Sequence, residues 1–167
     1  MCHKFWMPDV YWVDPSLGRV AILERPRGGE WIEDEARDLE SKDVHGVVTL
    51  LTPEEIEELE LQGEREALES RGLRFYSLPI PDGGTPPSES EARLLITKLA
   101  GLVKAGVSLG FHCRAGIGRS PMMAAAVLVA SGVPLDRALK AIAVARGWPV
   151  PETQEQIGWL KEFAKQS

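Results

Sequence analysis

The sequence has few of the features that mark several large classes of protein. Its 167 residues include only two cysteines, Cys2 and Cys113, so a disulfide-rich scaffold is excluded. The apolar run over residues 122–130 is too short to cross a membrane, so we expect no membrane partner. The formal net charge of −6 is opposite to the basic excess that nucleic-acid-binding proteins carry, so we expect no nucleic-acid partner.

Signals for protein targeting, for more than one domain and for metal binding are also scarce. Residues 1–8 contain no long apolar segment of the signal-peptide kind. We find no internal repeat and no low-complexity linker, and we expect a single domain over residues 1–167. Cys2 and His3 are too few for a metal site, and no other ligand cluster suggests a metal or cofactor.

Apolar and capping patterns alternate between strands and helices along the chain. Thr52, Pro53 and Glu55 supply an N-cap, a first-turn proline and a capping-box glutamate, and we expect the acidic helix that follows to present its charge to solvent. The order predicts an α/β fold with a central, mainly parallel sheet flanked by helices. The expected strands are 10–13, 19–23, 46–51, 73–78 and 107–112, and the expected helices are 31–42, 53–70, 88–104, 120–131, 135–146 and 152–165.

The most informative segment is HCRAGIGRS, at residues 112–120. It follows an apolar strand and precedes a helix, so its backbone N–H groups should converge at a helix N-terminus and favour an anion. Arg119 can fork two hydrogen bonds onto a phosphate. Cys113 stands at the centre of this cradle, where its thiolate can attack phosphorus, and Ser120 can donate to the sulfur when it leaves. A lone cysteine is more often a core residue, but the complete pattern favours a nucleophile.

This segment resembles the His-Cys-x5-Arg-Ser/Thr signature of the cysteine-dependent protein tyrosine phosphatases. Its Ala-Gly-x-Gly interior is similar to that of the small dual-specificity branch. The resemblance implies a phosphatase-type P-loop between a strand and a helix, with no metal or cofactor. It places Cys113, Arg119 and Ser120 in catalysis, and it places the rest of the loop in substrate binding, namely His112, Arg114, Ala115, Gly116, Ile117 and Gly118.

A second segment, LPIPDGGTPP at residues 78–87, has one carboxylate between prolines and glycines. Asp82 therefore lies in a loop with stiff edges and a flexible centre, although an aspartate before glycine is commonly only a turn residue. A mobile acid can protonate the leaving group as its loop closes. Asp82 lies 31 positions before Cys113, and phosphatases of this kind carry their general acid about one helix and one strand upstream. We therefore predict that Asp82 is the general acid.

The last helix offers a weaker candidate. Related small phosphatases place a glutamine of this helix at the active site, where it helps to position water. Gln156 matches by its place in Thr-x-x-Gln, Gln154 is the alternative, and a solvated helix face explains both residues equally well.

These observations predict a phosphatase that hydrolyses phosphotyrosine through a cysteinyl-phosphate. No extra loop carries a tyrosine-stacking aromatic residue, so phosphoserine and phosphothreonine are possible substrates too. Arg114 leaves a phosphoinositide or other non-protein phosphate ester as an alternative, although lipid phosphatases tend to carry a second basic residue where this chain has Ile117. A non-catalytic phosphoprotein-binding module and a sulfurtransferase are the remaining alternatives. The partner is then a phosphorylated protein or peptide, and the need for reduced thiols predicts a cytoplasmic location.

Overall fold

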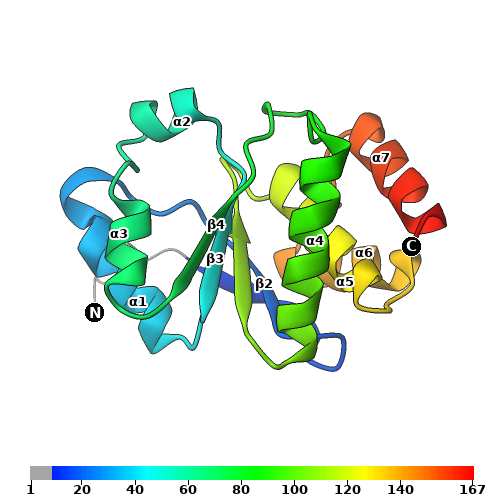
Figure 1. Ribbon diagram of the computed structural model, residues 1–167, viewed down its shortest axis with the longest axis horizontal. Helices are drawn as coiled ribbons and strands as arrows, with labels where there is room; N and C mark the ends of the chain where they lie inside the picture. The colour runs from blue at the N-terminus through cyan, green and yellow to red at the C-terminus, as the bar shows by residue number, and fades with distance from the viewer. Residues whose placement is uncertain (1–8) are drawn as a thin grey trace.

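The computed structural model describes residues 9–167, so Cys2 and His3 lie outside the described part. A five-stranded sheet with the order β1-β2-β5-β3-β4 runs through the middle of the molecule (Figure 1). β1 pairs with β2 in the antiparallel sense, and the other neighbours are parallel, which confirms the predicted mainly parallel sheet. The strands are β1 Val10–Trp12, β2 Val20–Leu23, β3 Gly46–Thr49, β4 Arg74–Ser77 and β5 Leu109–His112.

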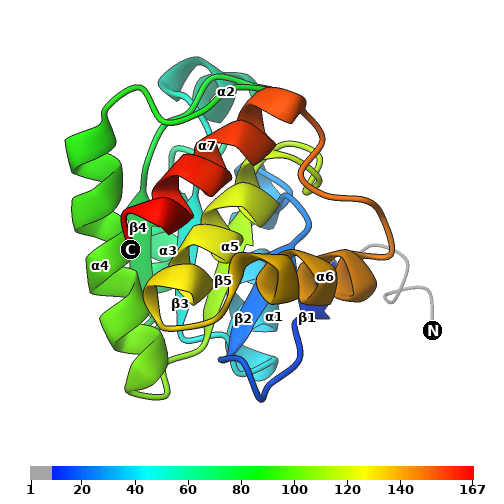
Figure 2. The same ribbon diagram turned by 90° about the vertical axis from the view of Figure 1, so that its right-hand side faces the viewer.

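Helices cover both faces of the sheet, and Figure 1 shows the two helical layers on either side. One layer holds α1 (Ile32–Ser41), which follows a short 3-10 turn η2 (Gly29–Trp31), and α3 (Glu64–Glu69). The other layer, which faces the viewer in Figure 2, holds α4 (Glu89–Lys104), α5 (Arg119–Ala130), α6 (Leu135–Arg146) and α7 (Gln154–Lys165). The remaining helix, α2 (Pro53–Glu58), follows β3 and lies beyond the carboxyl ends of the parallel strands.

Alternate residues of the strands serve two separate cores. Ile22 packs into the core under α4–α7, whereas its neighbour Leu23 packs into the smaller core under α1 and α3. This is the period of two expected of a strand covered on both faces. Helix α5 is buried over its first ten residues, as expected of a helix that is apolar nearly all round. The buried α5 fixes the loop that precedes it.

The predicted helix over residues 53–70 is wrong, because the chain forms α2 and α3 with a turn between them. α2 ends in a Schellman motif, in which Leu61 N donates to Ile56 O and Glu60 N donates to Glu57 O. Glu60 has a φ of 56° and occupies the left-handed position that glycine usually takes. Because no glycine marks this helix end, the sequence pattern does not reveal it. The solvated acidic face is also only partly correct, since Glu55 and Glu64 are buried.

Candidate active site

The segment between β5 and α5 curls around the sulfur of Cys113. Gly116, at φ 75°, donates its N–H to Cys113 Sγ over 3.4 Å, and Ser120 Oγ lies 3.2 Å from the same sulfur. Cys113 is 3% exposed, and it lies at the carboxyl end of β5, where open α/β sheets bind ligands. The predicted strand, loop and helix thus bring Cys113 and Ser120 into contact.

Gly118 allows α7 to approach this loop closely. A Cβ at this position would lie 2.8 Å from Glu152 Oε1 and 3.2 Å from the amide of Gln156, and no ordinary contact is that short. The start of α7 therefore packs directly against the loop that holds Cys113.

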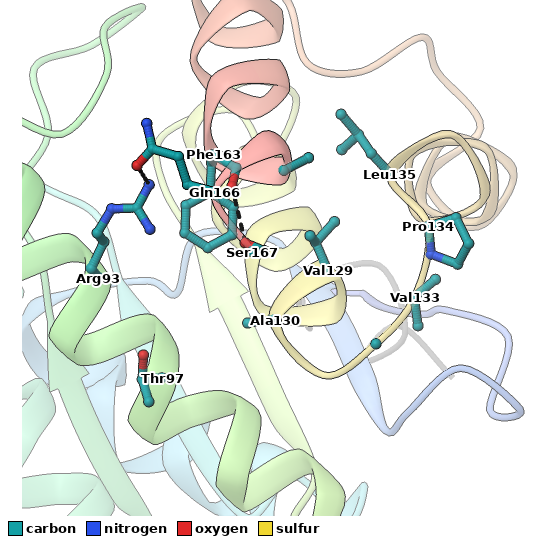
Figure 3. Close-up of a pocket in the computed structure, with 12 residues that line it drawn as sticks. Arg93, Thr97, Val129, Ala130, Val133, Pro134, Leu135, Phe163, Gln166 and Ser167 are labelled. Carbon is teal, nitrogen blue, oxygen red and sulfur yellow. Dashed lines mark hydrogen bonds between the residues drawn. The ribbon is translucent and has the colours of Figure 1, made fainter.

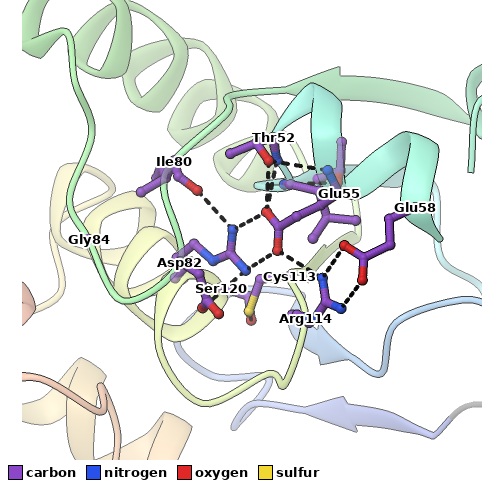
Figure 4. Close-up of polar contacts among 12 residues, drawn as sticks. Thr52, Glu55, Glu58, Ile80, Asp82, Gly84, Cys113, Arg114 and Ser120 are labelled. Carbon is purple, nitrogen blue, oxygen red and sulfur yellow. Dashed lines mark hydrogen bonds and ion pairs between the residues drawn. The ribbon is translucent and has the colours of Figure 1, made fainter.

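Arg119 is almost fully buried, and one edge of its guanidinium is already occupied. Nη1 donates to Glu55 Oε1 at 2.7 Å and to Ile80 O at 2.8 Å, and Nη2 donates to Glu55 Oε2 at 2.9 Å (Figure 4). These hydrogen bonds hold the pKa of Glu55 down at about 2. Burial disfavours the charge on Arg119, but Glu55, Cys113 and Asp82 outweigh it and raise the pKa of Arg119. The arginine is thus fixed as a cation above the loop.

The other edge of Arg119, made by Nε and the second hydrogen of Nη2, remains for a ligand. Nε donates no hydrogen bond to any residue in the described part of the chain, and Nη2 lies 3.3 Å from Asp82 Oδ1. Two parallel N–H groups of this kind fit two oxygens of a phosphate. The arrangement can therefore hold a phosphoryl group over Cys113.

The structure places Asp82 within ion-pair distance of Arg119. It stands in the loop between β4 and α4, next to Arg119, with its side chain 64% exposed (Figure 4). The loop is held by the start of α7: Gln156 Nε2 donates to Gly84 O at 3.1 Å, and Thr153 Oγ1 donates to Gly83 O at 3.5 Å. The carboxylate can therefore reach both solvent and the site.

The structure separates the two glutamines of the last helix. Gln156 is fully buried and accepts from Thr153 N as part of a capping box, whereas Gln154 is exposed. Gln156 therefore lies against the loop, and its amide contacts the segment that carries Asp82.

His112 points away from the phosphate cradle. Its ring is fully buried, Nε2 lies 2.7 Å from Glu64 Oε2, and Nδ1 has no hydrogen-bond partner. Because successive strand side chains point to opposite faces, His112 lies behind the loop when Cys113 faces its interior. Its side chain does not reach the substrate position.

The other predicted loop residues surround the opening. Arg114 is partly exposed and pairs with Glu58 at 3.0 Å, which raises the pKa of Arg114, and with Glu55 at 3.5 Å. Ala115 is exposed and Ile117 partly so, whereas Gly116 and Gly118 are buried.

Sequence reasoning missed three residues that hold the loop. The sequence predicts only a capping-box role for Glu55, which it also has, and only a solvated face for Glu64. Arg146 donates from Nε to Gly116 O and from Nη2 to Ala115 O, both at 3.2 Å. Glu55 offered one signal, because it follows β3 at the same sheet edge as Cys113.

A hollow of about 580 Å³ lies away from the loop that holds Cys113, between α4, α5 and the end of α7 (Figure 3). Arg93 and Phe163 line it, and none of the predicted site residues does. It adjoins the end of α7 opposite to Gln156, roughly 15 Å along the helix. Within residues 9–167 no helix is long and apolar enough to span a membrane, and no three His, Cys, Asp or Glu side chains are grouped as metal ligands.

Comparison with known proteins gives a consistent result. A family model described as "Polymorphic toxin system, DSP-PTPase phosphatase" matches residues 21–133. Cyclin-dependent kinase inhibitor 3 of Rattus norvegicus is 27% identical over 134 residues, which are 79% of this chain and 63% of that protein. The chain thus spans less than two thirds of the length of this curated relative.

Two solved structures are similar over nearly the whole chain. The crystal structure of Tk-PTP in its active form is 30% identical, with a TM-score of 0.73, and the match covers 95% of this chain and 97% of that one. The kinase associated phosphatase (KAP) structure has a TM-score of 0.83 at 19% identity, with 96% of each chain covered, and this likeness concerns the fold alone.

Proposed function

Because this chain belongs to the DSP-PTPase family of cysteine-dependent phosphatases, we propose that it hydrolyses phosphate monoesters on proteins through a cysteinyl-phosphate intermediate. The observation that carries the proposal is the arrangement around Cys113. Its sulfur is contacted by Ser120 and Gly116, and the open edge of Arg119 is placed to receive phosphoryl oxygens.

In the first half of the reaction, the Cys113 thiolate attacks phosphorus and the bond to the leaving oxygen breaks. Arg119 and the loop N–H groups hold the three remaining oxygens and stabilise their charge in the transition state. Asp82 donates its proton to the departing oxygen, so the leaving group is released as a neutral phenol or alcohol. When substrate binds, a phosphoryl oxygen accepts a hydrogen bond from the Nη2 hydrogen of Arg119 that faces Asp82 in the structure. The Asp82 side chain is then free to face the leaving group.

In the second half, water attacks the phosphorus of the intermediate and the bond to sulfur breaks. Asp82, now a carboxylate, accepts a proton from the water, and inorganic phosphate is released. Ser120 donates to the leaving sulfur across the 3.2 Å contact. Gln156 keeps the acid loop in place through Gly84, and we assign it this positioning role in addition to the predicted contact with water.

Phosphotyrosine is the proposed substrate, with phosphoserine and phosphothreonine accepted at a shallow site. No metal is needed, since the arginine and the backbone N–H groups supply the positive charge, so activity should survive a chelator. A cytoplasmic, reducing location is part of the proposal, because an oxidised Cys113 cannot act as the nucleophile. We also treat residues 1–167 as one phosphatase domain.

The test is phosphate release from phosphotyrosine, phosphoserine and phosphothreonine peptides by the purified chain, with Cys113→Ser as the matched control. We expect release by the wild type, and binding without release by Cys113→Ser. A wild type that binds phosphopeptides without hydrolysing them would instead be a binding module. Hydrolysis of a phosphoinositide, with no hydrolysis of any peptide, would favour the lipid alternative.

A further inference from the structure

Arg146, the last residue of α6, holds two carbonyl groups of the loop around Cys113. Its Nε donates to Gly116 O and its Nη2 donates to Ala115 O, both at 3.2 Å. These donors belong to one rigid, planar guanidinium. Two successive peptide groups of the loop are therefore held in one fixed orientation relative to α6.

The orientation of these carbonyls sets the direction of two N–H groups. Both peptide groups are trans, so the N–H groups of Gly116 and Ile117 point away from Arg146. The Gly116 N–H accordingly meets Cys113 Sγ, at 3.4 Å. The Ile117 N–H makes no hydrogen bond with any residue in the described part of the chain. Two donors thus face the interior of the loop, where the proposed mechanism places the phosphoryl group.

The loop does not impose this orientation by itself. Gly116 lies between the two peptide groups at φ 75°, and a residue without a Cβ lets either peptide group rotate at little steric cost. Within residues 9–167, Arg146 is the only side chain that donates to the carbonyl of Ala115 or Gly116. Its two hydrogen bonds therefore select one orientation of a segment that is otherwise free to adopt others.

Tyr11, on β1, holds Arg146 in turn. Helix α6 lies against β1 (Figure 2), and the Arg146 guanidinium is 4.6 Å from the centroid of the Tyr11 ring, which is a cation–π distance. The Tyr11 hydroxyl donates to Glu24 Oε1 at 2.8 Å, so the ring is itself anchored. Tyr11 and Arg146 form a clamp on the outer side of the loop.

We propose that Arg146 is a positioning residue for the reaction and that Tyr11 acts through it. The clamp keeps the N–H groups of Gly116 and Ile117 aimed at the phosphoryl oxygens. Donors that are fixed before substrate binds stabilise the charge of the transition state without having to reorganise. The inference rests on the proposed function and adds to it two residues that lie far from Cys113 in the sequence.

The first experiment measures kcat and KM of Arg146→Ala with a phosphotyrosine peptide. We expect kcat to fall by about 100-fold, as when one oxyanion donor is lost, with a smaller change in KM because the donors act mainly on the transition state. Guanidinium ion at a non-denaturing concentration should restore part of the lost activity, which it cannot do for a packing defect. Arg137→Ala is the matched control, an exposed arginine of the same helix, and it should keep the wild-type constants.

Two further variants separate positioning from charge and from packing. Arg146→Lys keeps the charge, but one amine cannot reproduce the planar pair of donors, so kcat should fall by about tenfold. Tyr11→Leu should lower kcat by about two- to fivefold in the wild type, the value of one cation–π contact, and should have no further effect in Arg146→Ala. Tyr11→Phe keeps the ring and should keep most of the activity.

Several outcomes would overturn the positioning role while leaving the proposed function intact. These are a wild-type kcat in folded Arg146→Ala, a loss that guanidinium does not restore, and losses from Tyr11→Leu and Arg146→Ala that simply multiply. If Arg146→Ala does not fold, a wild-type kcat in Arg146→Lys would overturn it equally.

Failure of the proposed function is distinguishable, because the wild type would then turn over no phosphorylated substrate. Calorimetry with tungstate, a tetrahedral dianion, would in that case test the clamp alone. We expect tungstate to bind Arg146→Lys about tenfold more weakly than the wild type, since aimed N–H donors are lost while the charge is kept. Equal affinities would overturn the positioning role.

Discussion

On each side of the same loop a carboxylate lies within hydrogen-bond distance of a nitrogen-bearing side chain, and the two pairs differ in access. In front of the loop, Arg119 is paired with Glu55 but keeps an edge free, next to an exposed Asp82. Behind it, His112 and Glu64 form a pair that is sealed, with side chains 0% and 6% exposed. The front pair leaves room for a ligand, whereas the back pair leaves none. In the proposed mechanism the front pair therefore takes part in the chemistry, and the back pair supports the shape of the loop.

The pKa values of two buried carboxylates also differ between the front and the back of the loop. Hydrogen bonds from Arg119 lower the pKa of Glu55 to about 2. Behind the loop, burial raises the pKa of Glu35 although Arg27 pairs with it. Glu35, Glu64 and His112 line the same narrow hollow under α1 and α3. The Arg119 cation thus has the largest effect on the pKa of Glu55, whereas desolvation has the largest effect on the pKa of Glu35.

The largest effect expected at the front is that of Cys113→Ser. A serine hydroxyl stays protonated at neutral pH, so turnover should fall by about 10⁴-fold or more. Phosphopeptide affinity should remain, because Arg119 and the loop N–H groups are unchanged. Phosphate release and calorimetry on the purified variant measure the two quantities, and retained turnover would refute the assigned nucleophile.

Arg119→Lys should have the next largest effect. Lysine keeps the charge but cannot bind Glu55 and a phosphate at the same time through two edges. We expect kcat/KM to fall by roughly 10²–10³-fold, the range seen when an oxyanion donor is removed. Steady-state kinetics with an aryl phosphate decides this, and near-native values would make the arginine a structural residue only.

Asp82→Asn should have an effect that depends on the leaving group. Alkyl esters need a proton from the acid and should lose about 10²-fold, whereas activated phenols should lose less. The basic limb of the pH–rate profile should flatten, since it reports loss of that proton. The measurement is kcat/KM against leaving-group pKa. Equal slopes for the variant and the wild type would exclude Asp82 as the acid and direct attention to Glu89 and Glu91.

The sequence predicts the front of the loop better than the back, for a physical reason. The cradle is local, since Cys113, Arg119 and Ser120 lie within eight consecutive residues and their spacing carries the chemistry. The supporting pairs are remote: Glu55 is 64 residues from Arg119, and Glu64 is 48 residues from His112. These long-range pairs can be recognised only once the turn at residues 59–63 is known, because this turn splits the expected helix and directs Glu64 inward. The strands and most helices follow from local patterns and are confirmed with small shifts at their ends.

A comparison of Glu55→Gln with Glu64→Gln tests the division between the two sides. Glu55→Gln weakens the anchor of Arg119 and should lower kcat/KM by about tenfold, with a small loss of stability. Glu64→Gln leaves a buried His112 with a weaker partner, so it should cost about 1–3 kcal/mol of unfolding free energy. Its kcat/KM at a temperature where it is folded should change little. Equal changes in activity for the two variants would remove the distinction.

The smallest expected effect is a difference in the pH dependence of stability. Glu55 ionises near 4.5 in the unfolded chain but stays charged down to about 2 when folded, so its contribution is complete above pH 4.5 and is lost as the pH falls towards 2. Glu35 behaves oppositely, because its raised folded-state pKa makes its contribution largest at low pH and loses it as the pH rises above 4.5. Urea unfolding of the wild type, Glu55→Gln and Glu35→Gln between pH 3 and pH 6 measures both. The deficit of Glu55→Gln relative to the wild type should grow with pH, whereas that of Glu35→Gln should shrink. Only the slopes are compared, so a constant packing loss in either variant does not matter, and parallel slopes would show that the two carboxylates have the same electrostatic environment.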